Sequence, residues 1–400
     1  MILLRHAVGP GRGTFTVERG RNSYSRLVRA RMRRTLVNDV VDTPVLFELG
    51  DTARLREFEA SVQKIEMGSF SRTLRREDRW LKTEETIGED QVFFGVVADG
   101  HGGSEASEHA VARVVQYICS EAAGDATSAS LKWAGQRAFA RLHEEVCASG
   151  TTAGTTLTVC AVNPHRRELT TMNVGDSIAL LYPRPLKSLP TTAAASQPQQ
   201  LTADHRLQTN TKEQLRCKLQ GAMIARAVDP TTGGPGGPLR VWPGGVAQVR
   251  TIGDADVGRI ISPLPASSTI ILPDTGSWDC IICSDGVSDA LAYPTLFKLC
   301  RRSKLASAST TAKLVVDEAV AKRHAFNNEG FQVPRDDTTC VILRFLDPRD
   351  TDASAGCALE TCEDVGPLPH VDVGKDHVHD AFDSSHFRAV GPEGAGQDRL

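Results

Sequence analysis

The 400-residue chain is predicted to be of the α/β class, with an α+β domain in which antiparallel β-sheets are covered by helices. Two observations carry this prediction. Strand-like runs occur in pairs joined by short turns, such as "TTLTVCAV" and "ELTTMNVGD" on either side of "NPHRR". Helix-like runs, with apolar residues three or four positions apart, stand between these groups of strands. The mixture favours antiparallel sheets over a parallel one.

The first strong strand signal is "QVFFGVVAD" (91–99), and it leads through glycines into a helix expected over 105–122. Ser104 is expected at the N-cap of this helix, whose residues Ala106, Ala110 and Val114 fall on one face. A second helix is predicted over 130–148 and a late one over 311–326. The remaining predicted strands are 155–162, 168–176, 177–182, 278–285 and 338–345.

Composition narrows the class of protein. A formal net charge of -3, with 40% hydrophobic and 24% charged residues, is typical of a soluble globular protein. No uninterrupted apolar stretch approaches the length that spans a bilayer, and the near-neutral charge gives no reason to expect nucleic acid or a membrane as a partner. We expect a monomer.

The chain is predicted to have three parts. Residues 1–55 form a basic arm that is either disordered or a targeting segment, 56–347 form the folded domain, and 348–400 form a disordered tail. Loop insertions are expected at about 183–200 and 229–246, where Pro, Gly and Gln are concentrated. Ten scattered cysteines indicate reduced thiols, so we expect an intracellular protein of the cytoplasm or nucleus; the Arg-rich arm leaves a mitochondrial location open.

Acidic residues end several of the apolar runs. Asp99, Asp176 and Asp285 stand at predicted strand ends, while "RREDRW" and "PRDDTTCVILRF" place acidic pairs just before strands. A single Asp-Gly after a strand is usually a hairpin turn. Their joint occurrence favours a rim of carboxylates, whose mutual repulsion would require protons or a cation. Acid-rich oxygen ligation suits Mg²⁺ or Mn²⁺.

The segment "FFGVVADGHGG" resembles the FFGVFDGHGG signature of the type 2C metal-dependent protein phosphatases, the PPM family, which remove phosphate from Ser and Thr. The other motifs follow in the family's order from about Met67 to Phe345. They are "RREDRW", "TTAGTTLTVCAV", "MNVGDS", "LTADH", "TIGD", "IICSDGVSDAL" and "RDDTTCVILRF".

This resemblance implies two antiparallel β-sheets packed as a sandwich and flanked by helices, with two Mg²⁺ or Mn²⁺ ions at one end and phosphorylated proteins as substrates. Adjacent metals would lower the pKa of a bridging water and clamp the phosphate. The implied ligands are Asp99 between both ions, Asp285 and Asp336 on one, and Glu77 and the Gly100 carbonyl on the other. Asp78 would orient water and ligands. Asp176, Asp285 and Asp289 match a weaker third ion site.

Two catalytic roles follow from the same resemblance. His101 would donate a proton to the leaving alkoxide, and Asp254 of "TIGD" is expected to be structural or to support the ligands. An Arg should hold the phosphate, but the family position, four residues before Glu77, is Thr73 here. We assign this role to Arg72, with Arg75 and Arg76 nearby. Other departures from the family pattern are Ile178, Ser288 and Asp337.

Other readings of the sequence compete with this function. Cys160 and Arg166 have the Cys-x5-Arg spacing of cysteine phosphatases, but Pro164 lacks an N–H and the next residues read as a strand, so this reading is disfavoured. Cys280 and Cys283 have CxxC spacing, yet strand alternation would place them on opposite faces. The remaining alternative is a catalytically silent binding module that keeps the phosphatase fold.

Overall fold

The computed structural model describes residues 3–7, 14–18, 64–184, 198–229, 233–272, 276–302, 306–326 and 332–347. The chain divides into two units, Met1–Ser61 and Val62–Leu400. Within the first unit, β1 (Leu3–Ala7) pairs antiparallel with β2 (Thr14–Glu18), two strands that the sequence did not predict. The rest of the basic arm, the segment 185–197 and the tail 348–400 lie outside the described residues.

Two five-stranded antiparallel sheets form the centre of the second unit. The strand order of the first sheet is β15 (Ala266–Ile271), β9 (Glu168–Val174), β8 (Leu157–Asn163), β5 (Asp90–Ala98), β4 (Arg79–Ile87). That of the second sheet is β11 (Gln199–Gln200), β10 (Ile178–Arg184), β16 (Ser277–Cys283), β19 (Thr338–Leu346), β3 (Lys64–Arg72).

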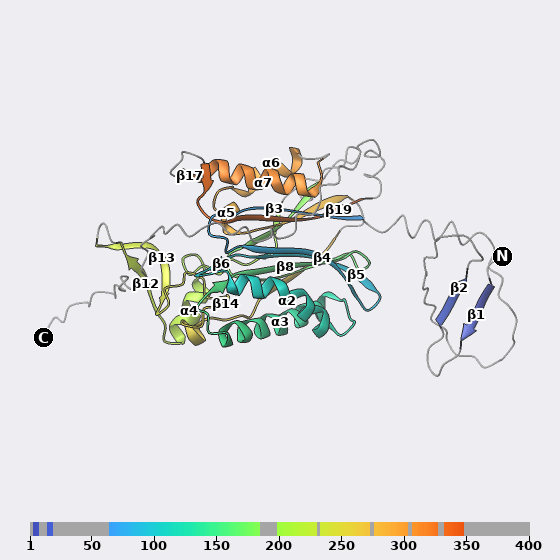
Figure 1. Cartoon of the computed structure of the whole chain (residues 1–400), viewed down its shortest axis with the longest axis horizontal. Coiled ribbons are helices and arrows are strands. Elements are labelled where there is room, and N and C mark those ends of the chain that lie inside the picture. Colours follow the sequence, from blue (N-terminus) through green and yellow to red (C-terminus); the bar gives the residue numbers. More distant parts are fainter. Residues whose placement is uncertain are drawn as a thin grey trace, which may run out of the picture. The chain divides into compact units, whose positions relative to one another are not determined.

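Helices cover the outer face of each sheet. The first sheet carries α2 (Glu105–Ala122) and α3 (Ser128–Ala148), and the second carries α5 (Asp285–Ser288), α6 (Tyr293–Arg302) and α7 (Ala308–Lys322). Figure 1 shows the resulting four layers, with α6 and α7 on one side and α2 and α3 on the other. The predicted sandwich of two antiparallel sheets flanked by helices is therefore confirmed.

Side-chain alternation divides the core into layers. Along β16, Cys280 and Ile282 pack between the two sheets, whereas Ile281 and Cys283 pack under the helices. This period of two follows from the pleat of a strand that is buried on both faces. It confirms that the two cysteines of the CxxC spacing face opposite ways, which is incompatible with a shared metal or disulfide.

One local prediction is confirmed in position, and another needs correction. Ser104 is the N-cap residue of α2, as predicted, but its side chain makes no capping bond and instead donates to Glu108 Oε1 at 3.1 Å. The late helix ends at Lys322, and the following residues form β17 (His324–Phe326), paired with β18 (Gln332–Pro334). Helical periodicity alone does not mark where a helix ends.

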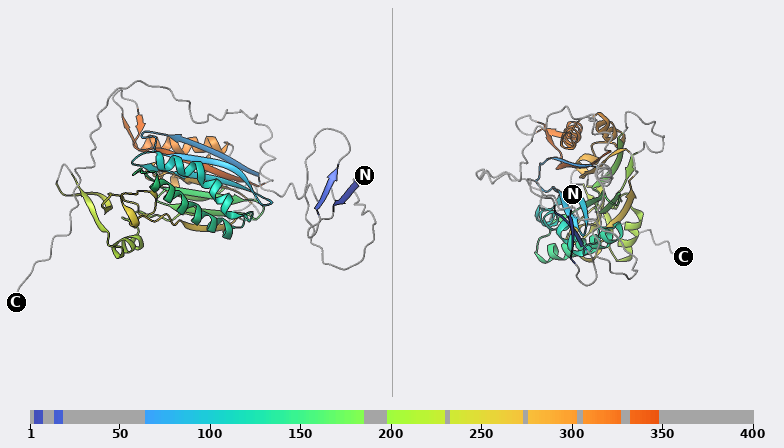
Figure 2. Two further views of the ribbon diagram at one scale, coloured as in Figure 1. Left: turned by 60° about the horizontal axis from the view of Figure 1, so that its bottom comes forward. Right: turned by 90° about the vertical axis from the view of Figure 1, so that its right-hand side faces the viewer.

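The predicted loop at 229–246 contains a strand. β13 (Pro235–Trp242) pairs with β12 (Met223–Val228), and β12 adjoins α4 (Thr211–Leu219), a helix that was not predicted. Gly and Pro are tolerated in such an isolated two-stranded ribbon because few of its backbone groups need a second partner. Apolar residues of this region, including Leu207, Cys217 and Val241, form a small separate core. Figures 1 and 2 show this lobe protruding from the sandwich.

A short three-stranded sheet follows the end of β5. Its strands are β14 (Ile252–Gly253), β7 (Gly154–Thr155) and β6 (Gly100–His101), in that order. A single 3₁₀ turn, η2 (Gly258–Ile260), comes after β14. No helix among the described residues is long and apolar enough to cross a membrane.

Candidate active site

The acidic residues predicted from the sequence lie at one end of the sandwich. The register of β4 and β5 pairs Arg79 with Ala98, so Asp78 and Asp99 are brought to the same edge. In the second sheet Cys283 pairs with both Ile178 and Cys340, which brings Asp285 to the edge where β10 and β19 begin. Antiparallel pairing thus gathers acidic positions that are separated by more than 200 residues.

Hydrogen bonds and charge connect these carboxylates. The Asp285 N–H donates to Asp99 Oδ2 at 3.3 Å, and Thr339 Oγ1 donates to Asp78 Oδ2 at 2.7 Å. Burial, followed by the charges of Asp78, Asp285 and Asp176, raises the pKa of Asp99 well above its usual range.

The pKa values of two neighbouring carboxylates, Asp78 and Asp285, are raised as well. Burial is also the main cause that raises the pKa of Asp78 to about 7, with the charges of Asp337 and Asp336 adding to it. For Asp285, burial and the charges of Asp176, Asp336 and Asp289 raise the pKa to about 7. The carboxylates destabilise one another's charge, as expected for a site that is built to hold a cation.

The glycines that follow Asp99 and Asp285 permit close backbone packing. A Cβ on Gly100 would lie 2.6 Å from the carbonyl oxygen of Glu77, and one on Gly286 would lie 2.1 Å from that of Asp337. Neither glycine is in the left-handed region of backbone conformation. The Asp-Gly pairs are therefore not hairpin turns: each glycine lets one strand end approach the acidic segment of another.

Glu77 is held by the start of α2. Its Oε1 atom accepts a hydrogen bond from the Gly103 N–H at 2.8 Å, and its carbonyl accepts one from Ser107 Oγ at 2.5 Å. The Gly103 backbone just before α2 thus fixes the side chain of Glu77, and Ser107 in the first turn of α2 fixes its backbone. Its side chain and the Gly100 backbone come from adjoining segments, as the predicted ligand set requires.

Asp337, the second residue of the acidic pair before β19 and a departure from the family pattern, anchors the acidic segment before β4. Its two carboxylate oxygens accept hydrogen bonds from five successive backbone N–H groups, those of Leu74, Arg75, Arg76, Glu77 and Asp78. The bonds from Glu77 and Asp78 measure 2.6 and 3.0 Å. Burial alone would raise the pKa of Asp337, but these bonds outweigh it and lower the pKa.

His101 has an acidic partner. Its Nε2 atom lies 2.7 Å from Asp254 Oδ1, and Thr251 Oγ1 donates to Asp254 Oδ2 at 2.5 Å. The short sheet β6–β7–β14 explains the contact, because it aligns His101 with Gly154 and Gly154 with Gly253, the neighbour of Asp254. Burial would lower the pKa of His101, but the Asp254 hydrogen bond and charge outweigh it and raise the pKa.

Arg206 lies at this rim, although it was not among the site residues predicted from the sequence. It follows the motif "LTADH", and its guanidinium contacts Asp176, Asp289 and Asp285. The motif was recognised, but nothing in its spacing indicated where the next side chain would point. Asp176 also accepts from Gln248 Nε2 at 2.7 Å.

Arg72, assigned to phosphate from the sequence, points elsewhere in this structure. Its guanidinium donates to Asp317 of α7 from Nε at 3.1 Å and from the terminal nitrogen at 2.9 Å. Arg75 and Arg76 are exposed in the segment that Asp337 anchors. Arg72 is the last residue of β3, whose pairing with β19 places it beside α7.

The cysteine-phosphatase alternative is excluded by the position of Cys160. This residue lies within β8, fully buried between the sheets, and its thiol contacts Thr171 Oγ1 at 3.6 Å. Arg166 pairs with Asp90 at 2.6 Å in the turn after the strand. A phosphate could not reach this thiol, and no helix start faces it from the following residues, which form β9.

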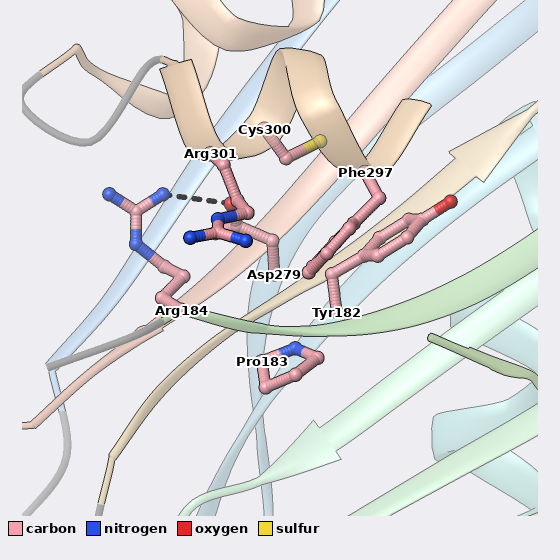
Figure 3. A pocket seen from close by; sticks show the side chains of 7 residues that line it. All are labelled: Tyr182, Pro183, Arg184, Asp279, Phe297, Cys300 and Arg301. Carbon is pink, nitrogen blue, oxygen red and sulfur yellow. Dashed lines mark hydrogen bonds and ion pairs between the residues drawn. The ribbon is translucent and has the colours of Figure 1, made fainter. Parts of the chain in front are cut away.

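A pocket is found at the opposite end of β10 and β16 from the carboxylates (Figure 3). Tyr182 stacks on Phe297 of α6 with ring centroids 5.6 Å apart, and Arg184 reaches Asp279 at 2.8 Å. The remaining lining residues are Pro183, Cys300 and Arg301. Because Asp279 is fully buried and also pairs with Arg344 at 2.7 Å, this ion network is part of the packed second sheet.

The residues at the rim fit divalent cations by their chemistry. Among the described residues, Asp78 Oδ1 and Asp176 Oδ1 are buried oxygens without a hydrogen-bond partner. Such atoms are costly unless a cation or water meets them. Nevertheless, no group of three or more His, Cys, Asp or Glu side chains within the described ranges is arranged to hold a metal ion as it stands. The donor types therefore fit, while their side chains are not preset at coordination distances.

Comparison with known proteins agrees with the motifs, the fold and the carboxylate rim. Residues 65–327 match the Protein phosphatase 2C family, and the chain belongs to this family. It is 34% identical over 289 residues to "Probable protein phosphatase 2C 5" of Arabidopsis thaliana, covering 70% of this chain and 61% of that protein. It is 32% identical over 259 residues to "Probable protein phosphatase 2C 3" of Oryza sativa subsp. japonica, covering 64% and 48%.

Solved structures share the fold. The C. elegans sex determining protein superposes with a TM-score of 0.59 at 20% identity, covering 72% of this chain and 66% of that one. The serine-threonine phosphatase 2C from Toxoplasma gondii gives a TM-score of 0.56 at 17% identity, covering 70% and 95%. The matched region spans about half to three fifths of the two plant relatives, so activity is argued below from this chain's own residues.

Proposed function

We propose that the chain is a protein serine/threonine phosphatase that hydrolyses phosphoserine and phosphothreonine on proteins in the presence of Mg²⁺ or Mn²⁺. The observation that carries this proposal is the convergence of Asp78, Asp99 and Asp285, whose pKa values are raised by burial and by neighbouring carboxylates. A cluster that repels its own charge is stabilised by cations. Membership in the protein phosphatase 2C family supports the same reaction.

The proposed ligands are those implied by the sequence. Asp99 would contact both ions, Asp285 and Asp336 one of them, and Glu77 with the Gly100 carbonyl the other. When bound, the two cations would supply the Lewis acidity that makes water nucleophilic and neutralises the phosphate oxygens. Asp78, held by Thr339, would orient water beside them. Asp337 supports this set by fixing the backbone of Glu77 and Asp78.

His101 is the proposed proton donor. In the hydrolysis, a bond from phosphorus to the water oxygen forms as the bond to the seryl or threonyl oxygen breaks. The leaving oxygen then takes a proton from the His101 imidazole. Asp254 favours the protonated ring by its hydrogen bond and charge, and Thr251 fixes the orientation of this carboxylate. Arg72 remains our assignment for phosphate binding, and that role would require its guanidinium to leave Asp317.

A direct assay tests the proposal. The full chain should release phosphate from a phosphothreonine peptide with Mn²⁺, should stop on chelation by EDTA, and should be unaffected by thiol alkylation. Equal activity with and without chelator would overturn metal dependence. Phosphorylated proteins are the proposed substrates, while a monomeric state and an intracellular location remain predictions.

The silent binding module is the second candidate. It is favoured by the absence, within the described residues, of a preset group of three or more metal-binding side chains. This alternative predicts that the protein folds cooperatively but does not bind Mn²⁺ and does not hydrolyse phosphopeptides.

A further inference from the structure

One guanidinium spans the three acids that the family resemblance assigns to a weak third ion. Arg206 Nε lies 2.5 Å from Asp176 Oδ2, and a terminal nitrogen of the same group lies 3.1 Å from Asp289 Oδ1 and 3.8 Å from Asp285 Oδ2. Asp176 follows β9, while Asp285 is the first residue of α5 and Asp289 is the residue after that short helix. The positive group therefore sits among carboxylates from two segments that are far apart in the sequence.

The backbone that carries Arg206 is fixed. Its N–H donates to Asp204 Oδ1 at 3.0 Å, and the residue forms an isolated β-bridge with Gln248. On one side, the His205 N–H donates to the Gly175 carbonyl at 3.2 Å, immediately before Asp176. The Arg206 side chain therefore extends to the acids from a backbone that is held in place by hydrogen bonds.

A second arginine completes the pairing. Arg323, at the end of α7, places a terminal nitrogen 3.0 Å from Asp289 Oδ2. Both oxygens of Asp289 are therefore in ion pairs, one with Arg206 and one with Arg323. Asp176 Oδ2 already accepts from Arg206 and Gln248. Of the carboxylate oxygens of Asp176 and Asp289, only Asp176 Oδ1 is left without a partner among the described residues. The donor set for a third divalent ion is consequently incomplete, and it does not fit that ion.

Charge supports the same conclusion. Burial would lower the pKa of Arg206, but the charges of Asp176, Asp289 and Asp285 outweigh it and raise the pKa further. A guanidinium does not lose its proton in proteins, so this positive charge is permanent. It is also partly removed from solvent, with 31% of the side chain exposed, which weakens screening by salt.

We propose that Arg206 is a tethered cation that takes the place of the third divalent ion at Asp176, Asp285 and Asp289, so that the chain holds two ions where the family pattern provides for three. This inference rests on the proposed two-ion phosphatase site. One consequence concerns the metal response. A tethered single charge is always present, so catalysis should saturate when the two remaining ions are bound and should not rise again at higher concentration.

The experiment counts Mn²⁺ ions bound to the full chain. After removal of metal, calorimetric titration with MnCl₂ should give two ions for the wild type and a third, weaker one for Arg206→Gln. At Asp176, Asp285 and Asp289, Mn²⁺ should bind roughly 5- to 150-fold more tightly to the variant than to the wild type, the usual range for coupling between two binding events. Arg206→Lys, which keeps a positive charge, should restore the wild-type count.

Control variants separate the possible outcomes. Arg137→Gln breaks an ion pair with Glu121 on the exposed side of α3 and should leave the count at two. Three ions on the wild type, or no added ion on Arg206→Gln with a wild-type melting curve, would overturn the role of Arg206 while leaving the proposed function intact. If Arg206→Gln does not fold, the ion counts of the wild type and of Arg206→Lys test the inference. Three ions bound to either protein would overturn it, and two ions bound to each would support it.

The proposed function fails separately. A wild type that binds no Mn²⁺ would reject the two-ion site, and one added ion in Arg206→Gln would then still support the role of Arg206. If neither protein bound Mn²⁺, both proposals would be rejected.

Discussion

The Nε2 atom of His101 lies 2.7 Å from Oδ1 of Asp254, although 153 positions separate the two residues in the chain. Three two-residue strands create this contact, since β6 pairs with β7 and β7 pairs with β14. Asp254 adopts a left-handed backbone conformation, with φ at +54°, which a short Asp side chain tolerates better than most. The pair has the geometry of an imidazole oriented by a carboxylate.

Removing the carboxylate should therefore weaken proton donation. We expect His101→Ala to slow hydrolysis of a phosphoserine peptide by about 100-fold or more, and Asp254→Ala by about 10-fold or more, with a much smaller loss on p-nitrophenyl phosphate. The nitrophenolate leaving group needs no proton, so it serves as the internal control. Equal losses on both substrates would show that the pair does not donate a proton.

Asp337 should control the acidic segment before β4. Replacement by Ala leaves five backbone N–H groups without their acceptor, and we expect about 1–3 kcal/mol of lost stability. Because Glu77 and Asp78 belong to this segment, the affinity for Mn²⁺ should fall as well, whereas Asp337→Asn should keep part of both. Urea denaturation and Mn²⁺ titration measure the two effects. An Ala variant with wild-type stability and affinity would contradict this role.

The buried ion network of the second sheet should respond to one substitution. Asp279 is fully buried and pairs with Arg344 at 2.7 Å and Arg184 at 2.8 Å. Asp279→Ala strands a buried guanidinium, so we expect a loss of about 3–5 kcal/mol in unfolding free energy. Arg166→Ala, which removes only an ion pair at the exposed turn, is the control and should change stability by less than about 1 kcal/mol. Similar effects of both substitutions would refute the prediction.

Glu213 gives the small lobe a pH dependence. Its Oε2 lies 2.7 Å from Arg216 Nε, and its Oε1 lies 2.8 Å from a terminal nitrogen of Arg250. Burial would raise the pKa of Glu213, but the two arginines outweigh it and lower the pKa below its usual value. A lowered folded-state pKa means that this stabilisation is complete above the unfolded-state pKa and is lost as the pH falls through the folded value.

The sign of this effect is testable. Glu213→Gln should cost about 1–3 kcal/mol of unfolding free energy at pH 7, and the difference from the wild type should shrink as the pH is lowered below about 4. Glu318, whose side chain is 40% exposed and pairs with Lys322 at 3.8 Å, provides the control as Glu318→Gln. A difference that stayed constant between pH 7 and pH 3 would mean that Glu213 is not held ionised by its arginines.

Much of the sandwich was predictable because its signals are local. Alternation along β16 and the turn between β8 and β9 can be read from neighbouring residues, and so can the acids at the strand ends. The structure of the segments between these strands and helices was harder to predict from the sequence. The β12–β13 ribbon lies in a segment whose Gly and Pro content is typical of a loop.

The contacts of the site were harder to predict because they depend on pairing between distant segments. Arg206 reaches Asp176 because residues 204–207 are bonded to the ends of β9 and to 247–248. Asp337 meets five N–H groups only once β19 lies beside β3. The direction of the Arg72 side chain could not be predicted either. Its position close to the acidic motif follows from the sequence, but its guanidinium turns toward Asp317 of α7.

The most direct test of the account compares the wild type with Asp99→Asn in Mn²⁺-dependent hydrolysis of a phosphothreonine peptide. Asp99 is half-buried among the carboxylates, and Asn keeps its shape while removing its charge. We expect the wild type to turn over only with Mn²⁺ and the folded variant to lose activity by about 100-fold or more, because an oriented carboxylate is lost from the metal site. Equal hydrolysis by both proteins, or hydrolysis by the wild type that persists in EDTA, would contradict the account.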